Sequence, residues 1–433
     1  MKFLDINDKD FDRKFAAILA RGEETGKEVE QVVQGIIADI RKRGDEALLE
    51  YTHRFDRLDI DAGGLQIKEA EIERAFAKVL EQDIEALKLA VERVARFHEK
   101  QKQETWLSTD EEDILLGQMV TPLSRVGIYV PGGKASYPSS VIMNAVPARV
   151  AGVGEVVMVV PTPGGEINSH VLVAARLSGV DRIFRIGGAQ AVAALAYGTG
   201  TIPKVDKITG PGNIYVATAK KLVFGQVGID MIAGPSEILV INDGSGNPAH
   251  IAADLLSQAE HDELASSILI TTDRGFGEQV AAEVERQLKE LKREAIARKS
   301  WDAFGAVIVA GTLDEAIDFS NRIAPEHLEL AVTSPFDILP RIKNAGAVFL
   351  GHFTPEAAGD YLAGPNHTLP TGGTARFFSP LSVDDFVKKS SIVCFSEAGL
   401  NRLGSDIVRI AELEGLEAHG KSVSIRLGKV KNE

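Results

Sequence analysis

Two patterns of apolar and polar residues divide this chain. Over residues 1–109, apolar residues recur at helical spacing among many charged ones, as in 32–42 and 69–76. From about residue 120, short β-branched runs alternate with helical patterns. Nearly continuous apolar strands separated by helices are typical of a parallel sheet that is covered on both faces. The pattern therefore predicts an α/β protein with N-terminal helices.

The predicted strands fall into two groups, which define two βα modules at 110–235 and 236–380. The first group comprises 125–130, 155–160, 182–186 and 205–208, and the second comprises 237–241, 267–270, 306–309, 328–332 and 347–350. Helices are expected between them, including one over 278–299. Residues 353–380 are rich in Gly, Pro and Thr, which predicts a functional loop. The remaining segment, 381–433, is expected to be a helical tail that ends in a short strand at 422–427.

Composition narrows the functional classes. The chain has 433 residues, enough for two or three domains, and its formal charge of −14 disfavours binding to nucleic acid or an anionic membrane surface. The first residues lack the apolar core of a signal peptide, and no apolar run reaches the length of a membrane span. The single cysteine excludes an intrachain disulfide and fits a reducing compartment. We therefore expect a cytoplasmic protein without a membrane segment.

An adjacent Glu–His pair stands where a helix must end. Apolar residues recur at helical spacing up to Pro325, which cannot continue a helix and drives Ala324 out of the helical conformation. Glu326 and His327 then precede the apolar run 328–332. A carboxylate beside an imidazole offers two proton acceptors that can serve different steps near neutral pH. The alternative is a surface glutamate and a half-buried histidine at a helix end.

Three glycine-bearing turns follow predicted strands and open predicted helices. They are Val130-Pro-Gly-Gly133, Gly187-Gly-Ala-Gln190 and Thr209-Gly-Pro-Gly-Asn213. Such turns let backbone N–H groups at a helix N-terminus approach a phosphate. None matches GxGxxG, and no ribose-binding acid follows about 20 residues later. Three such turns in one module favour nucleotide binding in a non-standard mode, although each alone can be an ordinary tight turn.

Residues 254–262 carry a possible metal-binding pair. Gln258 and His261 are three apart and share one shoulder of a predicted helix, beside a buried stripe. Asp360, in the glycine-rich loop, and His419, in the tail, are further candidate ligands. Imidazole and carboxylate groups suit zinc, with glutamine as an uncommon oxygen donor. Spacing alone cannot join these residues, and each can be a solvated or hydrogen-bonded bystander.

Cys394 is a weaker candidate for chemistry. Many enzymes oxidise aldehydes through a thiohemiacetal on a cysteine thiolate. Here the cysteine lies in an apolar run, 391–396, that reads as a strand. Because a thiol in buried apolar surroundings is inert, we do not expect it to be catalytic.

With these motifs in place, the chain resembles the histidinol dehydrogenase family over nearly its whole length. The resemblance rests on long blocks in one order: 208–216, 233–240, 254–262, 321–330, 359–373 and 414–419. It implies two incomplete Rossmann-like parallel-sheet modules, and oxidation of L-histidinol to L-histidine in two NAD-dependent steps through a bound aldehyde. This reaction ends histidine biosynthesis. The resemblance also implies a homodimer whose tail, 381–433, crosses into the partner's site.

The resemblance implies roles for particular residues. The implied zinc ligands are Gln258, His261, Asp360 and His419. The implied substrate contacts are these four ligands together with Ser236, His327 and Glu414. The implied cofactor contacts are Tyr129, Gln190 and Asn213, and the implied catalytic pair is Glu326 and His327. Glu414 and His419 would act across the dimer.

The implied chemistry agrees with the residue types. A zinc ion with open positions can take both nitrogens of histidinol and so fix its carbinol for oxidation. His327 would accept the hydroxyl proton in the first oxidation, and Glu326 would activate water before the second. Three other functions stay open on the residues alone: a related dehydrogenase for another small alcohol such as a sulfonated diol, a zinc hydrolase, or a non-catalytic binding protein.

Overall fold

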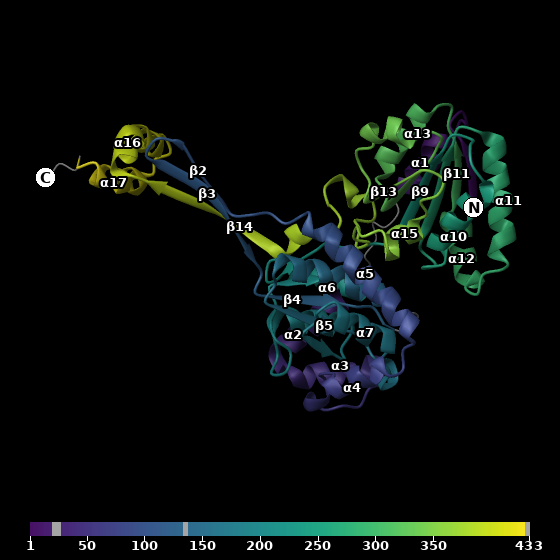
Figure 1. Ribbon diagram of the computed structural model, residues 1–433, viewed down its shortest axis with the longest axis horizontal. Helices are drawn as coiled ribbons and strands as arrows, with labels where there is room; N and C mark the ends of the chain where they lie inside the picture. Colours follow the sequence, from purple (N-terminus) through teal and green to yellow (C-terminus); the bar gives the residue numbers. More distant parts are fainter. Residues whose placement is uncertain (20–26, 133–136, 429–433) are drawn as a thin grey trace. The chain divides into compact units, whose positions relative to one another are not determined.

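A computed structural model describes residues 1–19, 27–132 and 137–428, and it divides into two compact units (Figure 1). The main unit comprises Met1–Gln101 and Leu123–Phe386. The tail unit comprises Lys102–Pro122 and Val387–Glu433. Among the described residues, no helix combines the length and the apolar character needed to cross a membrane.

The first sheet of the main unit has five parallel strands. In spatial order they are β6 (Arg182–Phe184), β5 (Glu155–Val159), β4 (Arg125–Tyr129), β7 (Lys207–Thr209) and β8 (Gly228–Ile229). Four of them confirm the strands predicted for the first module. Their side chains are mostly buried and otherwise partly buried, because helices cover both faces of the sheet. These helices are α2 (Lys27–Arg43), α3 (Asp45–Asp56), α4 (Glu69–Phe76), α5 (Glu81–Glu99), α6 (Pro138–Ala151), α7 (Ser169–Leu177), α8 (Gly188–Tyr197) and α9 (Ile214–Val223).

The second sheet has six parallel strands. In spatial order they are β1 (Lys2–Asp5), β11 (Ala306–Val309), β10 (Ser266–Thr271), β9 (Glu237–Asn242), β12 (His327–Ala331) and β13 (Ala347–Leu350). The last five confirm predicted strands. The edge strand β1 was not predicted, because four residues with one buried side chain, Leu4, show no usable alternation. The accompanying helices are α1 (Phe11–Leu19), α10 (Pro248–Ala259), α11 (Arg274–Leu288), α12 (Glu294–Phe304), α13 (Leu313–Ile323), α14 (Pro335–Ile338) and α15 (Glu356–Tyr361).

The prediction of one helix over 278–299 is wrong, because the chain forms α11 and α12 with a turn between them. Leu288 and Ala297 are both fully buried in the same apolar cluster. In one straight helix these residues, nine apart, would point in opposite directions at 100° per residue. The turn after Leu288 lets both helices bury their apolar sides against the sheet.

The tail unit contains an antiparallel sheet and two helices. Its strands are β2 (Trp106–Glu111), β3 (Ile114–Pro122) and β14 (Val387–Phe395), and its helices are α16 (Glu397–Leu413) and α17 (Glu417–Arg426). All nine residues of β3 pair with β14, so 102–122 belongs with the C-terminal segment. The sequence pattern divided the chain at 109/110 and 380/381 and did not predict that these two distant segments pair.

Two local expectations about the tail are wrong. The strand predicted at 422–427 is part of α17, in which Ser422 and Ser424 donate their hydroxyls to carbonyls of the preceding turn. Serines that bond to the preceding turn fit a helix without a partner strand. Cys394 lies on β14 but is exposed, because this stretch of the strand is not covered within the tail unit.

A buried ion pair holds the turn after β7. Lys220 Nζ contacts Asp230 and donates to the Gly210 carbonyl at 2.9 Å, and the two side chains are 3% and 1% exposed. Asp230 Oδ2 accepts the Gly210 N–H at 2.8 Å. Gly210 has φ of +109°, and a Cβ there would lie 2.1 Å from the Tyr129 carbonyl. The pair therefore fixes a backbone conformation that only glycine can adopt.

We expect Lys220→Met to lower the free energy of unfolding by about 3 kcal/mol or more, because it leaves Asp230 buried without its cation. Urea denaturation of the purified protein measures the change. Lys221→Met, at the exposed neighbouring position, is the matched control and should change stability by less than about 0.5 kcal/mol. Equal small effects of the two variants would show that the buried pair is not a stabilising element.

Candidate active site

The Glu–His pair lies at the start of β12, directly after the predicted helix end. α13 ends at Ile323, and Ala324 adopts a left-handed conformation with φ of 54° and ψ of 61°. Glu326 and His327 follow with exposures of only 6% and 4%. The alternative of a surface glutamate beside a half-buried histidine is therefore excluded.

The site is built at the amino edge of the second sheet. Glu326 Oε2 accepts the Glu237 N–H at 2.9 Å, and His327 Nδ1 lies 3.1 Å from the Glu237 carbonyl, at the start of β9. α10 follows β9 and runs back along the sheet, so its C-terminal end returns to this edge. That end carries Gln258 and leads directly to His261. The short helix α15 adds Asp360.

Side chains from these elements converge on His327. Ligand atoms of His327, Glu356 and Asp360 lie within 4.8 Å of one another. His327 Nδ1 is 3.5 Å from Glu356 Oε1, and Nε2 is 3.7 Å from Asp360 Oδ1. The Gln258 amide nitrogen lies 3.3 Å from His261 Nδ1, and with the amide turned over it lies 3.0 Å from Glu356 Oε1. Gln258, His261 and Asp360 thus lie in one cluster, in which Gln258 is buried, Asp360 is partly buried and His261 is exposed.

Sequence reasoning missed Glu356 and His367. Glu356 is 2% exposed and precedes Asp360 by four residues, so both face one side of α15. His367 Nδ1 lies 3.0 Å from the Asp360 carbonyl. The four-residue spacing was a usable signal, but it was hidden because 353–380 was read as a loop without a helix.

The protonation behaviour of the cluster reflects burial among several carboxylates. Burial raises the pKa of Glu326 to about 7 and that of Glu356 to about 8. Burial opposes the charged form of His327, but Glu356, Glu326 and Asp360 outweigh it and raise the pKa of His327 well above its usual value. Burial lowers the pKa of His261, which favours the neutral ring that binds metals.

These residues fit a divalent cation. The buried atoms His327 Nε2 and Glu356 Oε2 have no hydrogen-bond partner among the described residues. Imidazole nitrogens, carboxylate oxygens and an amide oxygen form a mixed N/O set of the kind that zinc accepts. Because several buried carboxylates crowd the cluster, a cation would also relieve their mutual repulsion.

The first sheet has a separate cavity of about 1110 Å³ at the carboxyl edge of its strands. Tyr129, Gln190 and Asn213, the three expected cofactor contacts, all line it. The Tyr129 hydroxyl accepts the Gly188 N–H at 3.0 Å, and the Asn213 side chain caps α9 by accepting the Tyr215 N–H at 3.0 Å. Two of the three glycine turns thus lie at helix N-termini. In the third, Gly132 lines the cavity and Gly133 lies outside the described residues.

The remaining expected contacts lie in different places. Ser236 is partly buried directly before β9, and its carbonyl accepts the Ser266 N–H at 3.0 Å. Glu414 and His419 are exposed in the tail unit, at the end of α16 and in α17. Their meeting with the residues of the main unit stays a prediction.

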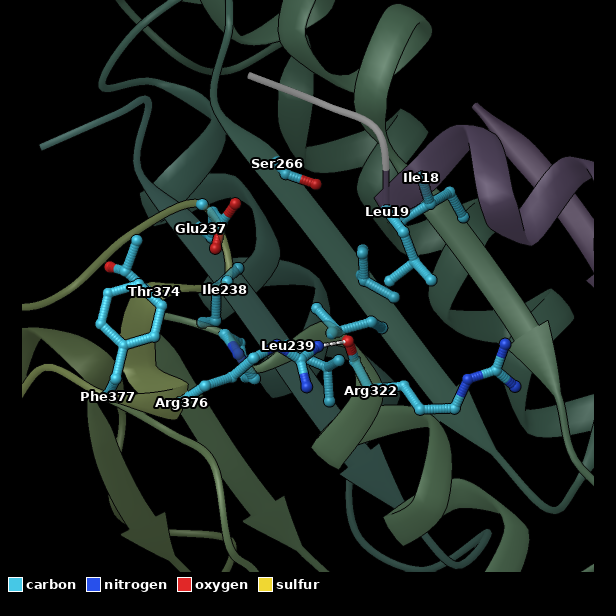
Figure 2. A pocket seen from close by; sticks show the side chains of 15 residues that line it. Ile18, Leu19, Glu237, Ile238, Leu239, Ser266, Arg322, Thr374, Arg376 and Phe377 are labelled. Atoms are coloured by element: carbon cyan, nitrogen blue, oxygen red, sulfur yellow. Dashed lines mark hydrogen bonds between the residues drawn. The ribbon is translucent and has the colours of Figure 1, made fainter. Parts of the chain in front are cut away.

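Part of the glycine-rich loop packs against the amino edge of the second sheet, beside a smaller cavity of about 300 Å³. Figure 2 shows the side chains that line this cavity. Glu237 and Ser266, the first residues of β9 and β10, line it together with Thr374 and Phe377. The Arg376 guanidinium donates to the Arg322 carbonyl at the end of α13 (Figure 2). The loop is therefore tied to the segment that precedes Glu326.

These features define an α/β protein with a large cavity in one parallel-sheet module and, in the other, a cluster of residues that could hold a metal ion. The chain belongs to the histidinol dehydrogenase family, whose model matches residues 19–427. It is accordingly an oxidoreductase of histidine biosynthesis.

Individual histidinol dehydrogenases match the sequence of this chain over nearly its whole length. The chain is 86% identical over 428 residues to histidinol dehydrogenases of Geobacter metallireducens and Geobacter sulfurreducens, covering 99% of this chain and 98% and 100% of those proteins. The crystal structure of a histidinol dehydrogenase from Elizabethkingia anophelis superposes with a TM-score of 0.94 at 38% identity, covering 99% of this chain and 98% of that one. The predicted fold class is confirmed.

Proposed function

We propose that this protein oxidises L-histidinol to L-histidine through bound L-histidinal, using one zinc ion and two molecules of NAD, in the cytoplasm. The observation that carries the proposal is the convergence of Gln258, His261 and Asp360 beside the buried pair Glu326 and His327. The name of the family and of the relatives identifies histidinol as the alcohol that they oxidise.

Zinc would be held by Gln258, His261 and Asp360, with His419 as the fourth ligand. A zinc ion held there would bind nitrogen groups of the substrate, and these residues would thereby orient its carbinol, a positioning effect of several kcal/mol. His419 and Glu414 belong to the tail unit, and we propose that they complete the site of the partner subunit in a homodimer. Ser236 and Glu414 would bind the remaining polar groups of the substrate.

His327 is the proposed base of the first oxidation. The Glu237 carbonyl can only accept a hydrogen bond, so Nδ1 carries a hydrogen and Nε2 is the basic atom of the neutral ring. Nε2 would receive the hydroxyl proton of histidinol. Surrounding carboxylates raise the pKa of His327 and favour the protonated ring, whereas the positive charge of a nearby cation would oppose them and favour a basic Nε2.

Glu326 is the proposed base of the second oxidation, in which water must add to the aldehyde. Burial brings its pKa to about 7, so a large fraction is ionised at neutral pH while the carboxylate remains basic enough to take a proton from water. The Glu237 N–H fixes one carboxylate oxygen and leaves the other for water. Tyr129, Gln190 and Asn213 would hold the nicotinamide cofactor, which would supply the hydride acceptor.

We expect the purified protein to release two NADH for each histidinol consumed, because both oxidations occur before product leaves. Absorbance at the NADH band, with histidine and histidinal quantified by chromatography, measures the ratio. Removal of metal by a chelator should abolish turnover, and added zinc should restore it. Release of one NADH with accumulation of histidinal would contradict the two-step proposal. If the protein did not oxidise histidinol but oxidised another alcohol, that alcohol would be its substrate.

A further inference from the structure

Asp56 occupies an unfavourable position unless it binds something. It is the last residue of α3, it is 8% exposed, and its Oδ2 has no hydrogen-bond partner among the described residues. A carboxylate at the C-terminus of a helix faces the negative end of the helix dipole. Burial raises the pKa of Asp56 to about 6. A buried acceptor left unsatisfied in the protein alone points to a ligand that donates to it.

The Asp56 side chain belongs to the wall of the large cavity of the first sheet. That cavity is also lined by Tyr129, Gln190 and Asn213. Burial raises the pKa of Tyr129 to about 12, and the charge of Asp56, which lies on the same cavity wall, adds to this shift. Asp56 therefore lies among the proposed cofactor contacts, although it comes from a helix that precedes the first module.

The module lacks an acid where such sheets usually provide one. In dinucleotide-binding folds, an Asp or Glu at the end of the strand beside the glycine turn binds the ribose hydroxyls. Here β5 is followed by Val160, Pro161 and Thr162, which offer no carboxylate. The only acids on the cavity wall within the described residues are Asp39, which is paired with Arg43, and Asp56. Asp56 is thus the available acceptor.

The same helix also offers a flat surface for a base. The rings of Tyr51 and Phe55 stack with centroids 5.8 Å apart and planes 6° apart, and both residues line the cavity. Phe55 is 49% exposed, and the Arg54 guanidinium lies 5.4 Å from the centre of its ring. An exposed aromatic face next to a ribose acceptor matches the two halves of an adenosine.

We propose that Asp56 accepts the 2′- and 3′-hydroxyls of the adenosine ribose of NAD and thereby selects NAD over NADP. This inference rests on the proposed NAD-dependent function and adds the residue that sets cofactor choice. Two hydroxyl donors would bind the carboxylate, whose Oδ2 has no hydrogen-bond partner among the described residues. The 2′-phosphate of NADP has no hydroxyl to donate there and brings negative charge against a buried carboxylate, which disfavours NADP even though Lys42 and Arg54 line the same cavity.

Asp56→Asn and Asp56→Ala test the inference in the full-length, zinc-loaded protein. Each should raise the KM for NAD and the Kd for NAD about tenfold or more, because a hydrogen bond to a charged acceptor is lost. Asp56→Asn should also raise the ratio of kcat/KM with NADP to that with NAD about tenfold, because the repelling charge is gone. The KM for histidinol should stay within about twofold.

Asp59→Asn is the matched control, because Asp59 is exposed three residues away and is not part of the cavity wall. It should leave both cofactor constants unchanged. Thermal unfolding at pH 8 checks the fold. Asp56→Asn should unfold no earlier than the wild type, because the buried charge destabilises the protein above pH 6 and is absent below pH 4.

Direct titration with NAD, without histidinol, separates this inference from the proposed function. If wild-type protein turns histidinol over but Asp56→Asn keeps the wild-type Kd for NAD and NADP, the role of Asp56 is overturned and the function stands. If histidinol is inert while NAD binding still weakens in Asp56→Asn and not in Asp59→Asn, the assignment of Asp56 stands and the function fails.

Discussion

Replacing Glu326 by glutamine is expected to slow the oxidation of added L-histidinal by about a hundredfold to ten-thousandfold, the usual contribution of a general base. The first oxidation, measured as a single turnover of histidinol, should slow less than about tenfold, because His327 is the proposed base of that step. Glutamine keeps an oxygen that can accept the Glu237 N–H, so the variant removes the base and preserves the local hydrogen bond. Stopped-flow measurement of NADH formation from each substrate compares the two steps.

The matched control for Glu326→Gln is Asp318→Asn, an exposed carboxylate on α13. It should leave both oxidations unchanged within about twofold. An equal loss of rate in both steps of Glu326→Gln would contradict the division of labour between Glu326 and His327. Glu326 would then serve the first proton transfer or the arrangement of the site as a whole.

The strands of both sheets could be predicted because each is a short apolar run between helical patterns. Runs such as 237–241 and 155–160 are buried on both faces, so their residue types alone identify them. The local sequence also predicted that Glu326 and His327 follow a helix end, because Pro325 limits where α13 can end. Gln258 and His261 became candidates through helical spacing, but α10 ends at Ala259, so His261 lies in the turn after the helix and not on it.

Features that depend on distant pairing could not be predicted. β1 is a strand only because β11, about 300 residues later, pairs with it. The pairing of β3 with β14 joins segments that the sequence separates into a module and a tail. Residues 422–426 are helical and Cys394 is exposed because the tail unit provides neither a partner strand for the first nor a covering element for the second. The local sequence pattern does not contain this information.

Asp56 and Glu356 show the same limit at the level of the site. Nothing near Asp56 in the sequence distinguishes it from the other acids of the charged N-terminal helices, and only the fold puts it on the wall of the cavity. Glu356 becomes a candidate once α15 is known to be a helix.

The proposed cofactor and metal sites lie at opposite ends of their strands, since the first lies at a carboxyl edge and the second at an amino edge. The general rule for parallel sheets places ligands at carboxyl edges, so it would have missed the metal cluster.

Replacing His261 by alanine is expected to remove the metal and to reduce turnover of histidinol at least a thousandfold, because zinc would lose both a ligand and the substrate geometry it fixes. Mass spectrometry or atomic absorption of the dialysed protein gives the zinc content, and a zinc-titration Kd gives the affinity. His170→Ala is the matched control, since His170 is a partly exposed ring on α7 that pairs with Asp83, and it should retain stoichiometric zinc.

Glu356→Gln distinguishes the two ligand sets that the geometry allows. The three groups nearest one another are His327, Glu356 and Asp360, whereas the proposed set in the main unit is Gln258, His261 and Asp360. If the proposed set holds zinc, Glu356→Gln keeps most of the metal, because its role is to contact His327 and Gln258. If His261→Ala kept stoichiometric zinc and Glu356→Gln lost it, the zinc ligands would instead be His327, Glu356 and Asp360. His327 would then be a ligand and could not serve as the base of the first oxidation, because its Nε2 lone pair would be bound to the ion.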